Sequence, residues 1–285
     1  MTEETLSHLD LAIPARDGYR LAATLFRPEA PSRNVVVIHC ATAVPRRFYR
    51  HFAAALAAAG YLALSYDYRG IGGSRPERMR GFEARMRDWA LLDMAGVVDW
   101  VQQEYAPSRL FFVGHSVGGQ IAGLLDNAGS VDGMITLSAQ SGHWALQGAE
   151  QKLVTALHAH VTLPLLPRLF GYMPWPGTSE DLPRGVALEW AAWCRDPKYL
   201  LGDETLPLDR FATFRAPVLA YSIGDDKWGT ARSVDAMMKA YPNLERRHLV
   251  PSDTGLKSIG HFGYFRPASR ALWADAIDWF NTRRG

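Results

Sequence analysis

The chain has 285 residues, of which 48% are hydrophobic, so it is long enough for one large α/β domain or a domain with an insertion, and it can bury a sizeable core. A formal net charge of +2 gives no electrostatic case for binding nucleic acid or an anionic membrane. The two cysteines, Cys40 and Cys194, are too few for a disulfide framework, and we expect both to be buried, reduced thiols.

Targeting and membrane segments are not predicted. The first twenty residues contain four acidic side chains and no continuous apolar core, so they do not resemble a signal peptide. No apolar run reaches the length of a membrane span. We therefore expect a cytoplasmic protein with no membrane span.

Strands and helices alternate over the first half of the chain. Two β-like runs surround Asp17-Gly18, a dipeptide that favours a tight hairpin turn. A β-branched strand at 35–38, a helix at 48–59 and a strand at 61–66 follow, and then a helix at 89–101 with its apolar residues on one face. This order predicts a mostly parallel sheet with right-handed crossovers.

The run Gly114-His115-Ser116-Val117-Gly118 comes next, after a short apolar strand at 110–113. It matches G-x-S-x-G, and small apolar residues up to Leu125 can continue it as a helix. Strand, sharp turn and helix form the context of a nucleophile elbow, in which Cβ atoms at positions 114 and 118 would clash. We therefore predict Ser116 as a nucleophile; the alternative is a serine on a glycine-rich surface turn.

The alternation breaks after a strand at 134–137. Residues 143–208 contain no clear strand, but they have helical segments, four tryptophans and a proline cluster. Insertions of this length are usually functional or separately packed. We predict a core domain of residues 1–142 and 209–285 and a helical cap at 143–208, whose apolar residues either line a substrate pocket or only pack the cap onto the core. These residues are Leu163, Leu165, Leu166, Leu169, Phe170, Met173 and Trp175.

The sheet pattern resumes with a strand at 217–223, a helix near 233–240, a strand at 245–250 and a closing helix at 267–283. Functional groups of an open parallel sheet collect at the carboxyl ends of its strands. Asp225 and Asp226 follow the first of these strands and His261 follows the second. Serine, aspartate and histidine thus occur in the chain order of an α/β-hydrolase triad.

The three residue types suit nucleophilic catalysis. A serine hydroxyl becomes nucleophilic when an imidazole accepts its proton, and the imidazole needs a carboxylate behind it. We choose Asp226 over Asp225, which then is a solvated loop carboxylate. Asp67 is a third candidate, although Arg69 beside it suggests a structural ion pair. His158 and His160 do not share a helix face, so no metal site is predicted.

An oxyanion hole needs two hydrogen-bond donors. The backbone N–H of Val117, at the start of the helix after Ser116, is one candidate. The second should come from the loop after the 35–38 strand, where we choose Ala41 and keep Thr42 as the alternative.

Together these residues resemble the α/β-hydrolase superfamily, and more narrowly its serine aminopeptidase and monoglyceride-lipase-like branch. The matching features are the Asp17-Gly18 hairpin, Asp67-Tyr68-Arg69-Gly70, the Ser116 elbow through Gly119, Asp226 and Gly260-His261-Phe262. The resemblance implies an eight-stranded, mostly parallel sheet flanked by helices, with a cap at 143–208. It departs from the family at Cys40, which stands where the oxyanion loop has glycine, and at Thr230, where many relatives have proline.

We therefore expect a cofactor-free serine hydrolase that cleaves a carboxylic ester, or a related acyl bond, of a hydrophobic small molecule. Ser116 would attack, His261 would act as base and then acid, and Asp226 would orient His261. An acyltransferase with the same triad and a non-catalytic ligand-binding member of the fold are the alternatives. The substrate-binding residues, the natural substrate and the oligomeric state are left open.

Overall fold

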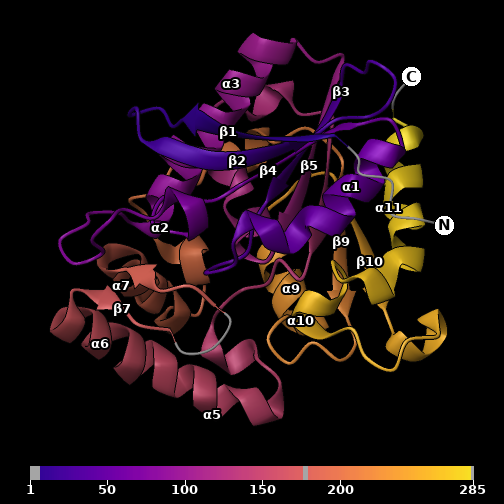
Figure 1. The fold of residues 1–285 in the computed structure, drawn as a ribbon. Coiled ribbons are helices and arrows are strands. Elements are labelled where there is room, and N and C mark those ends of the chain that lie inside the picture. The colour runs from indigo at the N-terminus through magenta and orange to yellow at the C-terminus, as the bar shows by residue number, and fades with distance from the viewer. Residues whose placement is uncertain (1–6, 176–178, 284–285) are drawn as a thin grey trace.

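The computed structural model describes residues 7–175 and 179–283 (Figure 1). Its centre is an eight-stranded sheet in the order β1-β2-β4-β3-β5-β6-β9-β10. The pairs β1–β2 and β2–β4 are antiparallel and the other five are parallel. This is the α/β-hydrolase fold, and the predicted fold class is confirmed. The strands of the sheet are β1 (His8–Pro14), β2 (Arg20–Phe26), β3 (Asn34–His39), β4 (Leu62–Tyr66), β5 (Arg109–His115), β6 (Gly133–Leu137), β9 (Val218–Ile223) and β10 (Leu244–Leu249).

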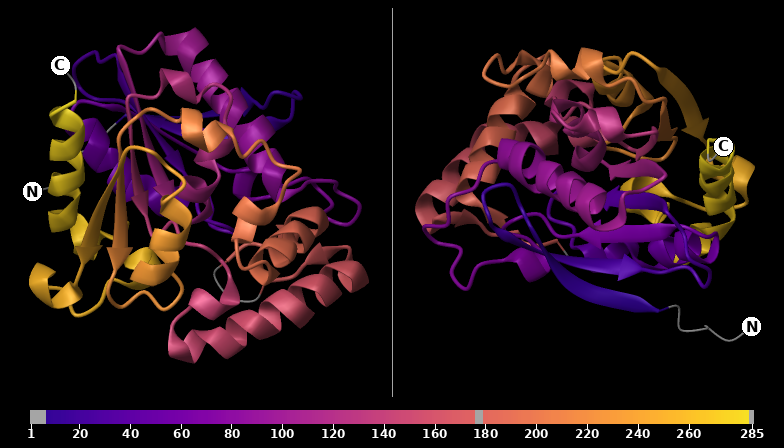
Figure 2. Two further views of the ribbon diagram at one scale, coloured as in Figure 1. Left: turned by 180° about the vertical axis from the view of Figure 1, so that it is seen from behind. Right: turned by 90° about the horizontal axis from the view of Figure 1, so that it is seen from above.

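Helices flank this sheet, as Figures 1 and 2 show. α1 and α11 pack together through Phe52 and Trp273, whose ring centroids lie 5.5 Å apart. The α-helices of four or more residues outside the segment between β6 and β9 are α1 (Arg50–Ala58), α3 (Ala95–Tyr105), α4 (Val117–Gln120), α9 (Ala231–Met238), α10 (Gly260–Gly263) and α11 (Arg270–Asn281). A π-helical turn, η3 (Trp89–Met94), continues into α3, and α8 (Arg210–Thr213) is the element directly before β9.

The turns predicted from glycine are present. Gly18 closes the β1–β2 hairpin with a φ of 84°, and Gly60 ends the segment after α1 with a φ of 87°. Both angles lie in the left-handed region that glycine adopts without a steric cost. The burial of the strands also follows the prediction, because β4, β6 and β9 are buried along their whole length.

One predicted element is shorter than expected. The helix after Ser116 was predicted to continue through Leu125, but α4 ends at Gln120 and a 3₁₀ turn, η4 (Ala122–Leu124), follows. A Cβ atom on Gly123 would lie 2.2 Å from the Phe211 ring. The chain bends here because Phe211 packs directly onto the backbone of Gly123.

The segment between β6 and β9 lies beyond the carboxyl ends of the parallel strands (Figure 1). It contains α5 (Ala149–Leu157), a π-helical turn η7 (His158–Thr162), α6 (Leu163–Phe170), the short pair β7 (Tyr172–Met173) and β8 (Leu182–Pro183), α7 (Arg184–Arg195) and a 3₁₀ turn η8 (Tyr199–Gly202). The two short strands were not predicted. We call residues 143–208 the cap, as predicted; its boundaries stay a prediction, and residues 176–178 lie outside the described part.

Candidate active site

Ser116 lies at a sharp turn between β5 and α4. Its backbone has a φ of 52° and a ψ of −118°, a conformation that costs a non-glycine residue free energy. Close packing explains the glycines around it. A Cβ on Gly114 would lie 2.5 Å from the Cα of Gly119, and a Cβ on Gly118 would lie 2.3 Å from the carbonyl oxygen of His39. The turn therefore has the backbone that a nucleophile elbow requires.

Asp226 and His261 are brought together from the ends of β9 and β10. The His261 Nδ1 atom lies 2.7 Å from Asp226 Oδ2. The other oxygen, Oδ1, accepts from the backbone N–H groups of Trp228 at 2.9 Å and Gly229 at 2.8 Å. A Cβ on Gly229 would lie 2.4 Å from Asp226 Oδ2, so glycine lets the loop close around the carboxylate.

The environment keeps the Asp226 carboxylate ionised. Its side chain is fully buried, and burial alone would raise its pKa. The charge and hydrogen bond of His261 and the N–H of Gly229 outweigh burial and lower the pKa to about 2. An ionised carboxylate can only accept, so the proton on His261 is held at Nδ1 and Nε2 is left as the basic nitrogen.

Asp225 holds the loop that carries His261. Its two carboxylate oxygens accept from the backbone N–H groups of Ile259 at 2.9 Å and Gly260 at 2.8 Å. Asp225 is a solvated loop carboxylate, as expected, but it has a structural role that the sequence did not indicate. Asp225 is exposed, but it fixes the two residues that directly precede His261.

A buried chain of hydrogen bonds joins the loop after β3 to the histidine loop. The Ala41 N–H donates to Tyr49 Oη, Tyr49 contacts His115 Nδ1, and His115 Nε2 contacts the carbonyl oxygen of His261, each at 2.8 Å. Burial lowers the pKa of His115 to about 3, so its ring is neutral. A carbonyl can only accept, so Nε2 carries the proton and Tyr49 donates to Nδ1.

This chain affects the predicted oxyanion hole. The Ala41 N–H is engaged by the Tyr49 hydroxyl and is not free in this structure. Thr42, the alternative donor, lines the same cavity as Ser116. Val117 is the first residue of α4, and the first N–H of a helix has no acceptor within the helix.

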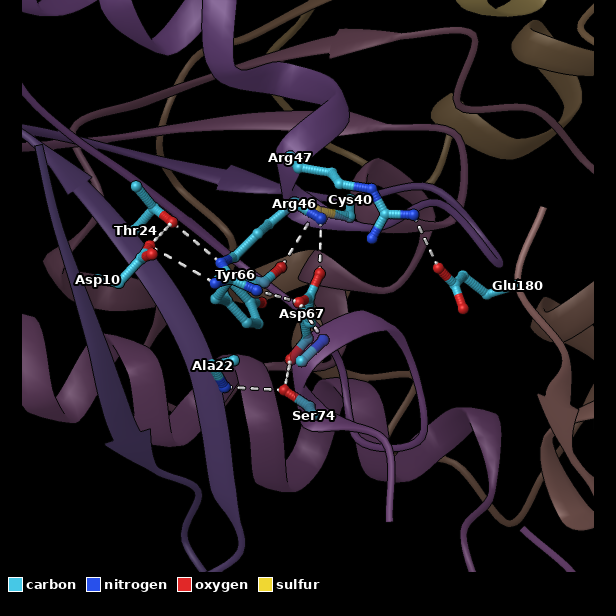
Figure 3. Close-up of polar contacts among 11 residues, drawn as sticks. Asp10, Ala22, Thr24, Cys40, Arg46, Arg47, Tyr66, Asp67, Ser74 and Glu180 are labelled. Atoms are coloured by element: carbon cyan, nitrogen blue, oxygen red, sulfur yellow. Dashed lines mark hydrogen bonds and ion pairs between the residues drawn. The ribbon is translucent and has the colours of Figure 1, made fainter. Parts of the chain in front are cut away.

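Asp67 contacts Arg46, the residue that follows the loop after β3 (Figure 3). It is fully buried and accepts from the Arg46 N–H at 2.5 Å, from the Arg46 guanidinium and from the Gly73 N–H at 2.8 Å. The suggested pair with Arg69 was wrong, because Arg69 instead pairs with Asp17 and Asp93. Asp67 therefore supports this loop, and the carboxylate that contacts His261 is that of Asp226.

Cys40 directly follows the last residue of β3. Its thiol is buried and donates to the carbonyl oxygen of Tyr66 at 3.1 Å (Figure 3). Burial raises the pKa of this thiol well above its usual range. Both cysteines are free and buried, as predicted.

Ser116 and His261 line one cavity of about 300 Å³ between the sheet and the cap. The cap contributes its helices and two tryptophans to the wall, and Trp228 and Phe262 flank His261. The remaining lining residues are Ala41, Thr42, Ala43, Gln140, Gly142, Gln147, Gln151, Val154, Thr155, His158, Ala159, Leu163, Trp175, Ser179, Trp190 and Cys194. Among the described residues, none that lines this cavity is an aspartate, glutamate, lysine or arginine.

The apolar cap residues named from the sequence divide into three groups. Leu163 and Trp175 line the cavity. Met173 and Leu166 pack against the core. Leu165, Leu169 and Phe170 are exposed. Other positions on the same helical segment, such as Thr155 and Ala159, also line the cavity.

Sequence reasoning missed Tyr49 and underestimated Asp225. Tyr49 falls within the helix predicted at 48–59, and no local pattern relates it to His115, 66 residues further on. Trp228, whose ring centroid lies 5.4 Å from that of His261 in an edge-on contact, was not among the predicted site residues. The described residues contain no cluster of three or more His, Cys, Asp or Glu side chains that could hold a metal ion.

Comparisons with known proteins identify the family and the fold. Residues 29–191 match the model of the family described as "Serine aminopeptidase, S33". No curated protein matches the sequence. The family and the fold support a hydrolase of the esterase and lipase kind.

Solved structures share the fold over nearly the whole chain. A soluble variant of monoglyceride lipase from Saccharomyces cerevisiae is 13% identical with a TM-score of 0.69, covering 99% of this chain and 96% of its own. The esterase domain of a Rhodothermus marinus protein is 17% identical with a TM-score of 0.64, covering 98% and 100%. An esterase of Pyrococcus furiosus is 15% identical with a TM-score of 0.60, covering 99% and 94%. At these identities the likeness concerns the fold alone.

Proposed function

The chain belongs to the serine aminopeptidase family of α/β-hydrolases, and from that premise we propose that it is a serine hydrolase that cleaves a carboxylic ester, or a related acyl bond, of a hydrophobic small molecule. The observation that carries the proposal is the placement of Ser116 and His261 on one cavity, with His261 held by Asp226 at 2.7 Å.

In this mechanism His261 Nε2 accepts the proton of the Ser116 hydroxyl as the serine oxygen attacks the acyl carbon. Asp226 keeps the Nδ1 proton in place and stabilises the imidazolium that forms. The imidazolium then protonates the leaving alcohol, and an acyl-enzyme on Ser116 remains. Water, deprotonated by His261, hydrolyses the acyl-enzyme and regenerates the serine.

The oxyanion that forms on the substrate needs donors in place before the reaction. We assign one to the Val117 N–H. The second is the Thr42 N–H, or the Ala41 N–H once it is shared with or released from Tyr49, and the bond from Ala41 to Tyr49 favours Thr42.

The character of the cavity favours an ester over an aminoacyl substrate. Binding the ammonium group of an aminoacyl substrate in a buried site calls for a compensating carboxylate. The described lining offers none, and its walls contain Trp175, Trp190 and Leu163. An uncharged, largely apolar ester suits these walls. We therefore expect much higher kcat/KM values on neutral acyl esters than on aminoacyl amides.

Two alternatives remain. An acyltransferase would use the same residues and pass the acyl group to an alcohol or amine, which product analysis with an added acceptor would reveal. A binding protein without catalysis would react poorly at Ser116 with a fluorophosphonate probe. Strained backbone at Ser116 and an ionised Asp226 behind His261 favour catalysis over binding alone.

Ser116→Ala tests the mechanism. We expect it to lower kcat on p-nitrophenyl butyrate by at least about 10³-fold, because the nucleophile is lost, while the fold is unchanged. Ser130→Ala is the matched control, since Ser130 lies on an exposed turn remote from the cavity. Full turnover by the Ser116 variant would refute the acyl-enzyme.

A further inference from the structure

α5, η7 and α6 form one continuous helical segment of 22 residues, Ala149–Phe170, at the outer edge of the molecule (Figures 1 and 2). Its length and composition would allow it to cross a membrane, and only 17% of its most apolar stretch is buried. Its two faces differ in their surroundings.

The inner face belongs to the active-site cavity. Thr155, Ala159 and Leu163 line that cavity, and the segment packs along α7. Insertion across a membrane would remove this wall, and it would bury Lys152 and Arg168 in hydrocarbon. The segment is therefore placed to lie on a surface and not to span one.

The outer face carries a row of exposed apolar side chains, which we call the outer stripe. Its members are Leu153, Val154, Leu157, Val161, Leu165, Leu169 and Phe170. Leu153 is 81% exposed and Leu169 is 62% exposed. Elsewhere in the described chain only Leu9 and Trp228 are large apolar side chains with comparable exposure. Such a concentration on one helix marks an interaction surface.

The charges around the stripe identify what it contacts. The segment contains one acidic residue, Glu150, and this carboxylate is paired with Lys227 at 2.6 Å. Lys152 lies near one end of the stripe, and Arg168 is exposed near the other. A cationic border around apolar side chains is the composition of helices that lie in the interface of an anionic bilayer.

A second copy of the chain suits the stripe less well. Two stripes related by a twofold axis with antiparallel helices would bring the Lys152 end of one copy to the Arg168 end of the other. Like charges would then face each other at both ends of the contact. The lipid surface, which supplies anionic headgroups, has no such repulsion.

We propose that the outer stripe docks this enzyme onto the surface of a bilayer that contains anionic phospholipid, with the helix parallel to the membrane plane. Val154 belongs both to the stripe and to the cavity wall, so docking places the cavity beside the lipid phase. A hydrophobic ester dissolved in the bilayer then has a short path to Ser116. Docking goes beyond the proposed hydrolysis and is measured without turnover.

Vesicle flotation of the full-length protein tests docking. The vesicles contain phosphatidylcholine with about a third phosphatidylglycerol, in low salt. We expect the wild type to float with them and the double variant Leu157→Glu, Leu165→Glu to bind at least about tenfold more weakly, because two inserted leucines become charged. Leu9→Glu, Ala30→Glu adds the same charge at exposed positions elsewhere and should float like the wild type. Pure phosphatidylcholine or high salt should weaken wild-type binding severalfold.

The result is independent of the hydrolase mechanism, because Ser116→Ala should float like the wild type. Leu157 and Leu165 do not line the cavity, so turnover of a soluble short-chain ester should be retained and reports correct folding. A second double variant, Leu153→Gln, Leu169→Gln, should lose binding without added charge. Docking is refuted if the wild type stays unbound, if both outer-stripe variants float normally, or if light scattering shows a dimer that these variants dissociate while vesicles bind nothing.

Discussion

Tyr49 joins two loops of the candidate active site through a single hydroxyl. It accepts from the Ala41 N–H and donates to His115, which in turn donates to the His261 carbonyl. The ring is fully buried and does not line the cavity, so Tyr49 is a positioning residue and touches no substrate.

Tyr49→Phe should therefore lower kcat by about 10- to 100-fold, because small displacements of catalytic groups have effects of this size, while KM changes little. The loss of two buried hydrogen bonds should also destabilise the fold by about 1–3 kcal/mol. Tyr61→Phe, which loses a bond to Asn281 far from the site, is the control. Steady-state kinetics and urea unfolding of both variants would separate positioning from stability; equal kcat losses would argue against positioning.

Asp225 and Asp226 are adjacent but have different hydrogen-bond partners, so their asparagine variants should lose activity to different extents. Asp226→Asn should lower kcat by about 10⁴-fold, because the imidazole loses its tautomer and its counter-ion. Asp225→Asn should lower kcat far less, since it weakens only the contacts to the Ile259 and Gly260 N–H groups. Kinetics on p-nitrophenyl butyrate would show this, and equal losses in the two variants would contradict it.

The Asp226 carboxylate also makes stability depend on pH. Its pKa in the folded state is about 2, below the usual 3.8, so its contribution is full above about pH 4 and is lost as the pH falls toward 2. The difference between these two pKa values corresponds to about 2 kcal/mol in the free energy of unfolding. Urea unfolding between about pH 5 and 3 should show that acidification lowers the free energy of unfolding less in Asp226→Asn than in the wild type. Parallel curves would contradict the lowered pKa.

At the residue scale, the sequence supplied the candidates but not all of their partners. Ser116, Asp226 and His261 could be named because each follows a recognisable strand. The roles of Tyr49 and Asp225 depend on backbone groups that the fold brings from elsewhere, such as the Ala41 N–H. No sequence spacing records such contacts.

At the scale of elements, the turn between β5 and α4 depends on close backbone contact. Gly118→Ala would place a Cβ 2.3 Å from the His39 carbonyl oxygen, which neither backbone can accommodate without moving. We expect a loss of at least about 3 kcal/mol in the free energy of unfolding, together with loss of activity. Gly129→Ala has nothing within 4 Å of its new Cβ and should change stability by less than about 1 kcal/mol. Similar unfolding midpoints for the two variants would contradict this account.

Strands and helices were predictable where their local sequence determines their secondary structure. The strand at 35–38 is a continuous apolar run and that at 134–137 is apolar except for Thr136, and the structure has β3 and β6 there. The length of α4 was not predictable, because the contact of Phe211 with Gly123 ends the helical segment. The short pair β7–β8 joins Tyr172 to Pro183 and Met173 to Leu182, within a proline-rich stretch that has no strand pattern.

At the scale of the whole molecule, the net charge and overall composition did not indicate the exposed apolar surface of the 149–170 helix. A net charge of +2 and the absence of a long apolar run in the sequence gave no reason to expect a membrane contact. The helix of residues 149–170 combines apolar residues with Lys152 and Arg168, and only its packing against α7 shows which residues stay outside. The proposed docking surface therefore required the structure.

The cap and the core are joined by one largely buried cluster of charges. Arg87, on the short helix α2 (Met86–Asp88), donates to Glu189 of α7 and, at 2.9 Å, to Asp203. The Arg87 side chain is only 16% exposed and that of Glu189 10%. Val186 and Ala187 of α7 belong to the same continuous apolar core as the sheet. We therefore expect the cap and the core to unfold together.

Arg87→Met tests this coupling, because it keeps the apolar stem but removes the cation from two poorly solvated carboxylates. Glu189 then keeps the Arg87 backbone N–H, and Asp203 keeps its bonds from Trp193 and Thr205. The free energy of unfolding should fall by about 2–3 kcal/mol, somewhat less than for a fully buried pair. Arg47→Met breaks the exposed pair with Glu180 and should cost less than about 1 kcal/mol. If α7 is part of one cooperative unit, Arg87→Met shifts a single transition in both near-ultraviolet dichroism and activity. A separate early transition that abolishes activity while the sheet stays folded would show instead that the cap unfolds on its own.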